Sequence, residues 1–177
     1  MHKNNIRELG LRVSGKSVKI IKDYANKARK VLGCESKEYI NMSNLMEILI
    51  HNDILIILED IDERVRKKYA YTHPDKAKIY VRESVYNSAC DCNPRARFTI
   101  AHEIGHLLMH KEQEVFARST CNNHKIYEDA EWQADVFAAS FLINQNFVNE
   151  NMTAEDIAEK FGVSLTAAQS WMKYKNK

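Results

Sequence analysis

The spacing of apolar residues near the start of the chain predicts two helices. From about Ser17 to Leu32, apolar residues recur at every third or fourth position, and Gly33 interrupts the pattern. Ser43 can cap a second helix that continues through His51, because its hydroxyl can accept a hydrogen bond from a free backbone N–H of the first turn. The N-terminal part of the chain is therefore expected to be helical.

Three short segments that follow have the composition of strands. Asp53 to Leu58 is almost wholly apolar and rich in isoleucine, and Val65 to Thr72 and Lys78 to Val85 flank the turn-forming sequence His73-Pro74-Asp75. Together they predict a small sheet of about three strands. Lys78 to Val85 is the candidate for an exposed edge of such a sheet, to which an extended chain could add as a further strand.

Helical spacing returns in the second half of the chain. Asn93 and Pro94 form a good N-cap and first-turn pair for a helix that runs to about Lys111. A further helix is expected from about Asp129 to Ile143, where alanine and larger apolar residues recur at helical spacing. The order of helices, then strands, then helices predicts an α+β fold.

The last residues predict a pair of short helices. Thr153 and Asp156 form a capping pattern, Gly162 punctuates the chain, and Ser164 can cap a final helix that ends near Tyr174. We expect residues 1–146 to form the main domain, and residues 147–177 to form a helical hairpin that packs on it and resembles a helix-turn-helix.

Composition and charge exclude several classes of protein. The 26 basic and 24 acidic side chains give a net charge of +2, which provides no electrostatic basis for non-specific nucleic-acid binding. The polar N-terminus resembles no secretory signal, and no apolar stretch is long enough for a membrane span. A cytoplasmic protein is predicted. Its four cysteines are therefore expected to be free thiols: Cys34, Cys90, Cys92 and Cys121.

The strongest chemical signal is a pair of histidines on the helix that starts at Asn93. His102 and His106 are four residues apart, which places them about 40° apart around the helix axis and about 6 Å along it, so both can reach one metal ion. Glu103 follows the first histidine, and this spacing is typical of a zinc (Zn²⁺) site in which the glutamate is the general base. In a non-functional interpretation, the two histidines lie on the face of the helix, form hydrogen bonds with neighbouring groups and bind no metal.

A catalytic zinc site usually has three protein ligands, so a third must come from elsewhere. His110 lies about 12 Å along the axis from His102, too far to share the ion, and is expected to be a partly exposed histidine at the helix end. The metzincin pattern is excluded, because it requires a glycine and a histidine where this chain has Met109 and Glu112.

The remaining pattern is a glutamate on a following helix. Glu131 is the predicted third ligand, and Asp135 lies one turn later on the same face, where it can orient a metal-bound histidine. Glu128 and Asp129 share this acidic stretch. Choosing Glu128 would put Trp132 in the orienting position, where no carboxylate could serve.

At this point the chain resembles a known family, the ImmA/IrrE metallopeptidases. The sequence from Arg97 to Leu108 (RFTIAHEIGHLL) resembles the central motif of the family, and that from Glu131 to Ala139 (EWQADVFAA) resembles its second motif. The resemblance implies a zincin-like fold, with the histidine helix packed on a small mixed sheet. It also implies a zinc-dependent endopeptidase that cleaves a DNA-binding helix-turn-helix repressor.

Two other functions remain open. One is a metal-binding regulator that binds a repressor without cleaving it. The other is a DNA-binding protein that uses the helices between Asp156 and Lys173, although few basic residues support this and direct nucleic-acid binding is not expected. For the peptidase, the donor that stabilises the oxyanion is not identified by any motif; His124 and Tyr127 are polar candidates near the second motif.

Overall fold

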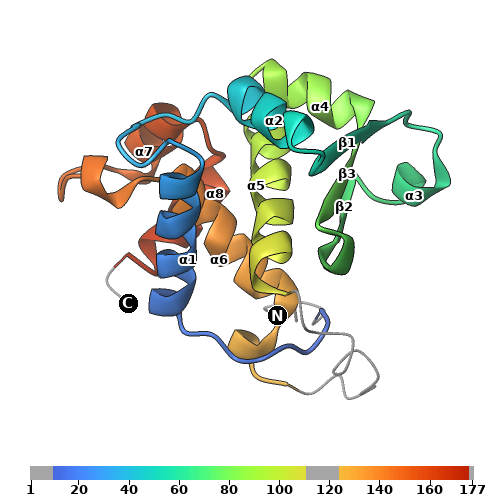
Figure 1. The fold of residues 1–177 in the computed structure, drawn as a ribbon. Helices are drawn as coiled ribbons and strands as arrows, with labels where there is room; N and C mark the ends of the chain where they lie inside the picture. The colour runs from blue at the N-terminus through green and yellow to red at the C-terminus, as the bar shows by residue number, and fades with distance from the viewer. Residues whose placement is uncertain (1–9, 111–123, 176–177) are drawn as a thin grey trace, which may run out of the picture.

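The structure, a computed structural model, describes residues 10–110 and 124–175. Its elements follow the predicted order of helices, strands and helices (Figure 1). The α-helices are α1 (Val18–Val31), α2 (Met42–His51), α3 (Glu63–Arg66), α4 (Glu83–Cys90), α5 (Pro94–Met109), α6 (Ala130–Leu142), α7 (Ala154–Phe161) and α8 (Leu165–Met172). The strands are β1 (Leu55–Leu58), β2 (Ala70–His73) and β3 (Lys78–Arg82).

The three strands form one small mixed sheet in the order β1-β3-β2. β1 pairs in parallel with β3, and β2 pairs with β3 in antiparallel fashion. The fold is therefore α+β, as predicted. However, β3 is the central strand and both of its edges are paired, so the expectation that Lys78 to Val85 offers an exposed edge was wrong. Among the residues that the structure describes, the strand beside α5 with an unpaired edge is β2.

Two predicted strands are shorter in the structure. Only the last part of Val65 to Thr72 joins β2, because Asp62 caps the short helix α3 by accepting a backbone hydrogen bond. β3 ends at Arg82, and α4, which was not predicted, follows directly. Val85 and Ala89 are buried one turn apart on α4, so the apolar spacing changes there from that of a strand to that of a helix.

Capping side chains determine where the central helices begin. The Asn93 side chain accepts two backbone hydrogen bonds at the start of α5, as predicted, and Asp129 accepts one at the start of α6. In α2 the cap is Asn41 rather than Ser43, so the helix begins two residues earlier than expected. These caps satisfy N–H groups that have no partner within the helix.

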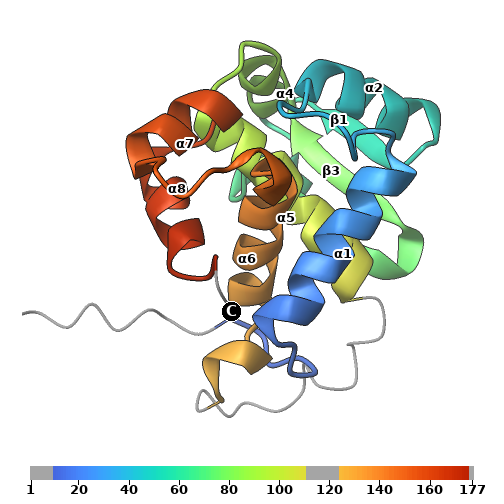
Figure 2. The same ribbon diagram turned by 90° about the vertical axis from the view of Figure 1, so that its left-hand side faces the viewer.

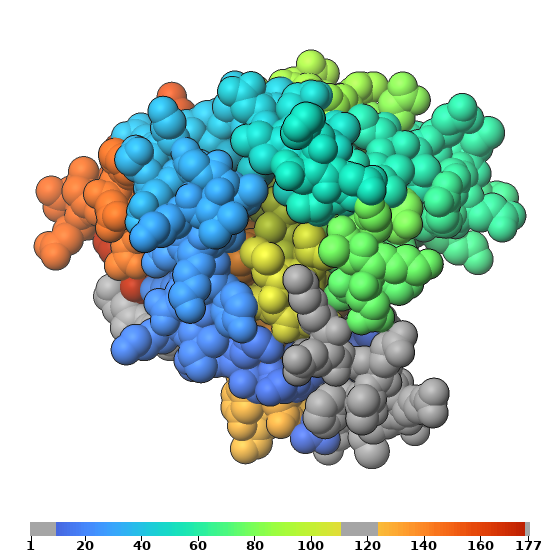
Figure 3. Space-filling model, viewed as in Figure 1, coloured from blue at the N-terminus to red at the C-terminus, as the bar shows by residue number. Residues whose placement is uncertain are grey.

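Helix α5 lies at the centre of the fold. It packs on the sheet through β2 and β3 and on the opposite side against α6, which also packs on α1 (Figures 1 and 2). On the face drawn in Figure 3, α5 (yellow) is visible between α1 (blue) and the β2–β3 hairpin (green), below α2 (cyan). The predicted active-site helix is thus largely enclosed by other elements.

Gly105 allows α5 and α6 to approach closely. A Cβ atom at this position would lie 2.9 Å from Cδ1 of Phe137, closer than van der Waals contact allows. Phe137 is fully buried on α6, and its ring stacks on that of Phe141 with the centroids 5.7 Å apart. The Phe137 ring therefore has little freedom to move away.

The segment before α1 lies along the start of α6. The N–H of Val13 donates to the carbonyl of Glu128 over 2.7 Å, and the N–H of Ala130 donates to the carbonyl of Leu11 over 3.0 Å. Between these bonds, Arg12 and Asp129 form an antiparallel bridge. The N-terminal segment is thereby held against the first turn of α6.

The C-terminal helices have the predicted caps. Thr153 and Asp156 form a capping box at the start of α7, Gly162 ends it in the left-handed conformation with φ of 61°, and Ser164 caps α8. Helix α8 packs on α7 and on α6, where Trp171 is buried.

A buried arginine links these helices to α5. Arg97 is fully buried and donates to the carbonyl oxygens of Ile40, Phe161 and Gly162 over 2.9–3.2 Å. Two of these oxygens lie at the end of α7, where a cation interacts favourably with the helix dipole. The guanidinium thus joins α5, α7 and the loop before α2.

Three cysteines lie within the described residues, and all three are free thiols, as predicted: Cys34, Cys90 and Cys92. Cys121 lies outside the described residues. Within residues 10–110 and 124–175, no helix combines the length and apolar character that a bilayer crossing demands.

Replacing Gly105 by alanine is expected to destabilise the protein by about 1–3 kcal/mol, because the added methyl overpacks the interface with Phe137. Helix propensity alone would give a gain of up to about 1 kcal/mol. Urea unfolding measures the difference. Thr99→Ala, at a more exposed position of α5, is the control and should change stability little. A Gly105→Ala variant more stable than the parent would contradict the close α5–α6 packing.

Candidate metal site and cleft

The predicted histidines lie close together on α5. Nε2 of His102 and Nε2 of His106 are 2.9 Å apart, and each side chain is 16% exposed. Glu103, between them in sequence, is buried. The helix therefore presents two imidazole nitrogens at one point, as their four-residue spacing predicted.

Glu131 of α6 joins this pair. Its carboxylate oxygens lie 3.2 Å from Nε2 of His102 and 3.4 Å from Nε2 of His106. The three ligand atoms all lie within 4.8 Å of one another. Bonds of about 2.0–2.1 Å would separate the ligands of a tetrahedral zinc ion by about 3.3 Å. The donor atoms of these residues, called here the His-His-Glu cluster, thus fit one metal ion.

Glu128 and Asp129, the acidic residues just before Glu131, form bonds with groups outside the cluster. The Glu128 carboxylate pairs with Arg12 over 3.2 Å and accepts the backbone N–H of Lys125. Asp129 is fully buried, caps α6 and accepts the backbone N–H of Gly10. Of these three acidic residues, Glu131 therefore lies beside the histidines. Glu128 and Asp129 instead form contacts that hold the backbone and Arg12.

Asp135 lies on the outer side of His102, with Oδ1 3.0 Å from Nδ1 of the ring. Burial alone would lower the pKa of His102, but hydrogen bonds with Asp135 and Glu131 outweigh it and raise the pKa to about 9. The hydrogen bond from His102, followed by the contact with His106, holds the pKa of Glu131 far below its ordinary value. Without a metal ion, a protonated His102 thus lies between two carboxylates.

Thr72 of β2 is a site residue that the sequence did not indicate. Its hydroxyl oxygen lies 2.5 Å from Oε2 of Glu103 and 3.1 Å from the backbone oxygen of the same residue, and both residues are buried. A hydroxyl has one proton to donate, and the charged carboxylate is the stronger acceptor. Thr72 therefore holds one carboxylate oxygen of Glu103 and leaves Oε1 for other partners.

His110 is buried, with 7% of its surface exposed, so the expectation of a partly exposed helix-end histidine was wrong. Its Nδ1 lies 2.8 Å from Nδ1 of His106, and its Nε2 lies 3.2 Å from Oε1 of Gln133 on α6. Burial, followed by repulsion from His106, lowers the pKa of His110 to about 3. The ring is therefore neutral at ordinary pH and supports the His-His-Glu cluster from outside.

The cluster lies in a cleft of about 730 Å³. Residues 68–75, which include β2, form one side, and residues 11–13 with the start of α6 form the other. His102, Glu103 and His106 of α5 lie between them. Residues of β2 and the cluster therefore line one cleft.

The two residues considered as oxyanion donors are not among those that line this cleft. His124 is almost completely buried and pairs with Asp129 over 3.2 Å. Tyr127 is 41% exposed, and its carbonyl oxygen accepts a hydrogen bond from Gln133. Neither candidate is supported by its position.

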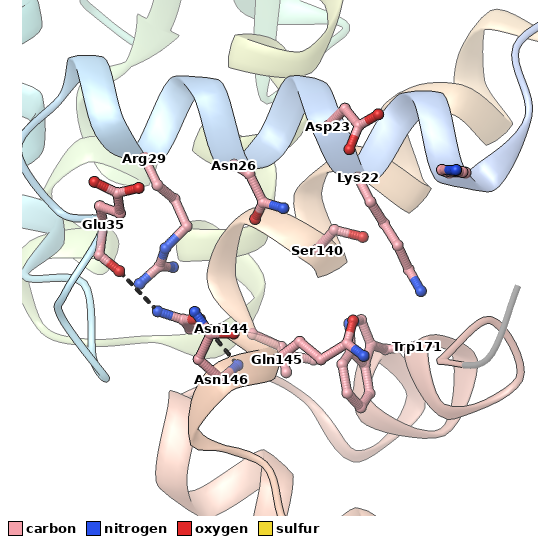
Figure 4. Close-up of a pocket in the computed structure, with 12 residues that line it drawn as sticks. Lys22, Asp23, Asn26, Arg29, Glu35, Ser140, Asn144, Gln145, Asn146 and Trp171 are labelled. Atoms are coloured by element: carbon pink, nitrogen blue, oxygen red, sulfur yellow. Dashed lines mark hydrogen bonds between the residues drawn. The ribbon is translucent and has the colours of Figure 1, made fainter.

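A second pocket of about 560 Å³ lies between α1, the end of α6 and α8 (Figure 4). Among the described residues that line it there is no histidine or cysteine. The buried guanidinium of Arg29 donates to the backbone oxygens of Phe141 and Lys37, and Asn144 donates to that of Glu35. These bonds join α1 to the end of α6, so the contacts of this pocket are structural.

Comparison with known proteins agrees with this arrangement. Residues 51–171 match the peptidase family described as the IrrE N-terminal-like domain. The metallopeptidase ImmA of Bacillus subtilis (strain 168) is 27% identical over 128 residues, which cover 68% of this chain and 70% of the relative. No solved structure matches. The matched region includes α5, α6 and the whole His-His-Glu cluster.

The metal-free protein is expected to lose stability as pH rises from about 6.5 to about 9. The pKa of folded His102 lies above the value of about 6.5 for an unfolded histidine, so the bound proton stabilises the fold below pH 6.5, and this contribution is lost through pH 9. Melting temperatures in a chelator would measure the slope. Asp135→Asn should flatten it, whereas Asp23→Asn on the exposed face of α1 should not; equal slopes in all three proteins would contradict the assignment.

Proposed function

This chain belongs to the ImmA/IrrE family of metallopeptidases, and on that premise we propose that it is a zinc-dependent endopeptidase with a zincin-like active site. The observation that carries the proposal is the His-His-Glu cluster beside Glu103 in a cleft bordered by a strand edge. The chain would hydrolyse a peptide bond of a protein substrate.

In this proposal His102, His106 and Glu131 hold the metal. Two imidazoles and one carboxylate are a donor set of catalytic zinc sites, which keep a fourth position for water or substrate. When bound, zinc polarises a carbonyl group and lowers the pKa of bound water. Asp135 orients His102 through Nδ1 and so keeps Nε2 directed at the cluster.

Glu103 is the proposed general base. Its carboxylate takes a proton from the attacking water molecule and later delivers it to the leaving amine. Thr72 fixes Oε2 of this carboxylate, so the proton transfer is assigned to Oε1. Burial of both side chains limits competition from bulk water for the same oxygen atoms.

β2 is the proposed docking edge for the substrate. Within the described part of the chain it has one strand partner, β3, so its other edge can pair with an extended peptide. Residues of β2 line the cleft together with the cluster, which would place a peptide bound to this edge next to Glu103. The substrate segment must therefore be extended or locally unfolded when it binds.

The proposed substrate is a helix-turn-helix repressor in the cytoplasm. This part of the proposal rests on the ImmA/IrrE motifs between Arg97 and Leu108 and between Glu131 and Ala139. A repressor encoded beside this chain is the natural candidate, because family members act on such partners. Neither a membrane nor a nucleic acid has a role in the proposal.

The main alternative is a regulator that binds metal without cleaving its partner. A purely structural zinc site fills all four positions with protein ligands and needs no base. Within the described residues, the cluster has three members, and the buried Glu103 lies beside it. These features favour catalysis over a structural site.

We further propose that residues 1–146 are the catalytic domain and that residues 147–177 are a supporting hairpin rather than a DNA reader. Helix α8 buries Ala168 and Trp171 against its neighbours and packs on α6, which carries Glu131. Between Leu165 and Met172 it contains no lysine or arginine, which reading of DNA would require.

Loss of a ligand is expected to abolish stable metal binding. His102→Ala or Glu131→Ala leaves two donors, and most of the zinc should be lost on dialysis. Asp135→Asn should weaken zinc binding about 10- to 100-fold. Glu128→Ala is the matched control, since its carboxylate pairs with Arg12. Competition with a chromophoric chelator measures each affinity. Retention of zinc by Glu131→Ala with loss by Glu128→Ala would refute the ligand assignment.

Peptidase activity is tested with the helix-turn-helix repressor encoded beside this chain as the substrate. The zinc-loaded protein should cleave it, and Glu103→Gln should keep zinc and fold but lose cleavage, because an amide cannot accept the proton of water. Glu128→Gln serves as the active control. Gel electrophoresis and mass spectrometry identify the products. An intact repressor with the zinc-loaded parent protein would instead support the non-cleaving regulator.

A further inference from the structure

We propose that Gln133 and His110 are positioning residues that set which ring nitrogen of His106 carries the proton. The chain of contacts runs from two backbone carbonyls to Gln133, then to His110, then to Nδ1 of His106. Its effect is to leave Nε2 of His106 unprotonated toward the His-His-Glu cluster. The inference rests on the proposed role of His106 as a metal ligand, and its first test reads the proton positions themselves rather than activity.

The Gln133 side chain is fully buried on α6. Its Nε2 lies 2.9 Å from the carbonyl oxygen of Ser14 and 2.7 Å from that of Tyr127, and it donates to both. An amide nitrogen has two protons, so both are used. Flipping the amide would place its oxygen against two carbonyl oxygens, and therefore Oε1 must face His110.

The orientation of Gln133 determines the proton on His110. Oε1 can only accept, so Nε2 of His110, 3.2 Å away, must donate. His110 is buried, and burial favours the uncharged ring. A neutral imidazole has one N–H, so Nδ1 of His110 carries a lone pair and is an acceptor.

Nδ1 of His110 lies 2.8 Å from Nδ1 of His106, so one of the two nitrogens donates a proton to the other. Since His110 accepts, His106 must carry its proton on Nδ1. A histidine that binds a metal ion through Nε2 has its one N–H on Nδ1, which leaves the lone pair on Nε2, the atom that lies 2.9 Å from His102 and 3.4 Å from Glu131. If His110 were instead a cation that donated from both nitrogens, His106 would turn an N–H toward the cluster.

The proton positions can be read directly by long-range ¹H–¹⁵N NMR of the histidine rings in the zinc-loaded protein. The expected result is a proton on Nε2 but not Nδ1 of His110, and a proton on Nδ1 but not Nε2 of His106. A protonated Nδ1 on His110, or a protonated Nε2 on His106, would overturn the proposal. This measurement uses the unaltered chain, so it does not depend on a variant folding.

Two variants then test the effect on metal affinity. His110→Leu removes the acceptor and is expected to weaken zinc binding about 10- to 100-fold. His110→Asn places a side-chain oxygen near the former Nδ1 position, so it should restore most of the affinity. His51→Leu, on the exposed end of α2, is the matched control and should bind zinc as the parent does. Melting temperatures show whether each variant is folded.

The variants distinguish a failure of the positioning role of His110 from a failure of the ligand assignment. Equal losses of affinity in His110→Leu and His110→Asn, with both folded, would show that packing rather than the hydrogen bond matters and would overturn the positioning role. If His106→Ala keeps its zinc, the ligand assignment fails, while the NMR result on the unaltered chain still decides the proton positions.

Discussion

The close approach of α5 to α6 is the constraint on which the site depends. Two histidines on one helix offer two ligand atoms, so the third must come from an element packed against that helix. Gly105 permits this packing, because any larger residue would meet the buried Phe137 ring. Asp129 then sets the first residue of α6 and so places Glu131 in its first turn, beside the histidines. A carboxylate later on α6 would lie about 1.5 Å farther along the axis for each residue.

The two histidines of the cluster are supported in different ways. Asp135 stabilises the charged form of His102, whereas a neutral histidine, His110, lies against His106. A carboxylate at the buried position of His110 would add negative charge next to a site that already holds Glu103 and Glu131. Burying an uncompensated charge is costly, so a neutral chain of hydrogen bonds orients His106 at lower cost.

β2 connects the chemistry to the substrate. Its side chains alternate, so Ala70 and Thr72 are buried while Tyr71 and His73 are partly exposed. Thr72 holds the Glu103 carboxylate, and residues of the same strand line the cleft. A peptide that pairs with this edge would therefore contact the element that positions the proposed base. The prediction of a three-stranded sheet was confirmed, but its edge was assigned to the wrong strand.

Local spacing in the sequence determined the helices that carry the site, the cap at Asn93 and the pairing of His102 with His106, because these depend on residues within one or two turns of each other. The motifs between Arg97 and Leu108 and between Glu131 and Ala139 also indicated the family, which the comparisons confirmed. Only the tertiary structure decided the order of the strands, the contact of Thr72 with Glu103 and the burial of His110. Thr72 and Glu103 are 31 positions apart in sequence, and His110 and its partner on α6 are 23 apart. Such contacts leave no periodic signal, because they arise when separately formed elements pack together.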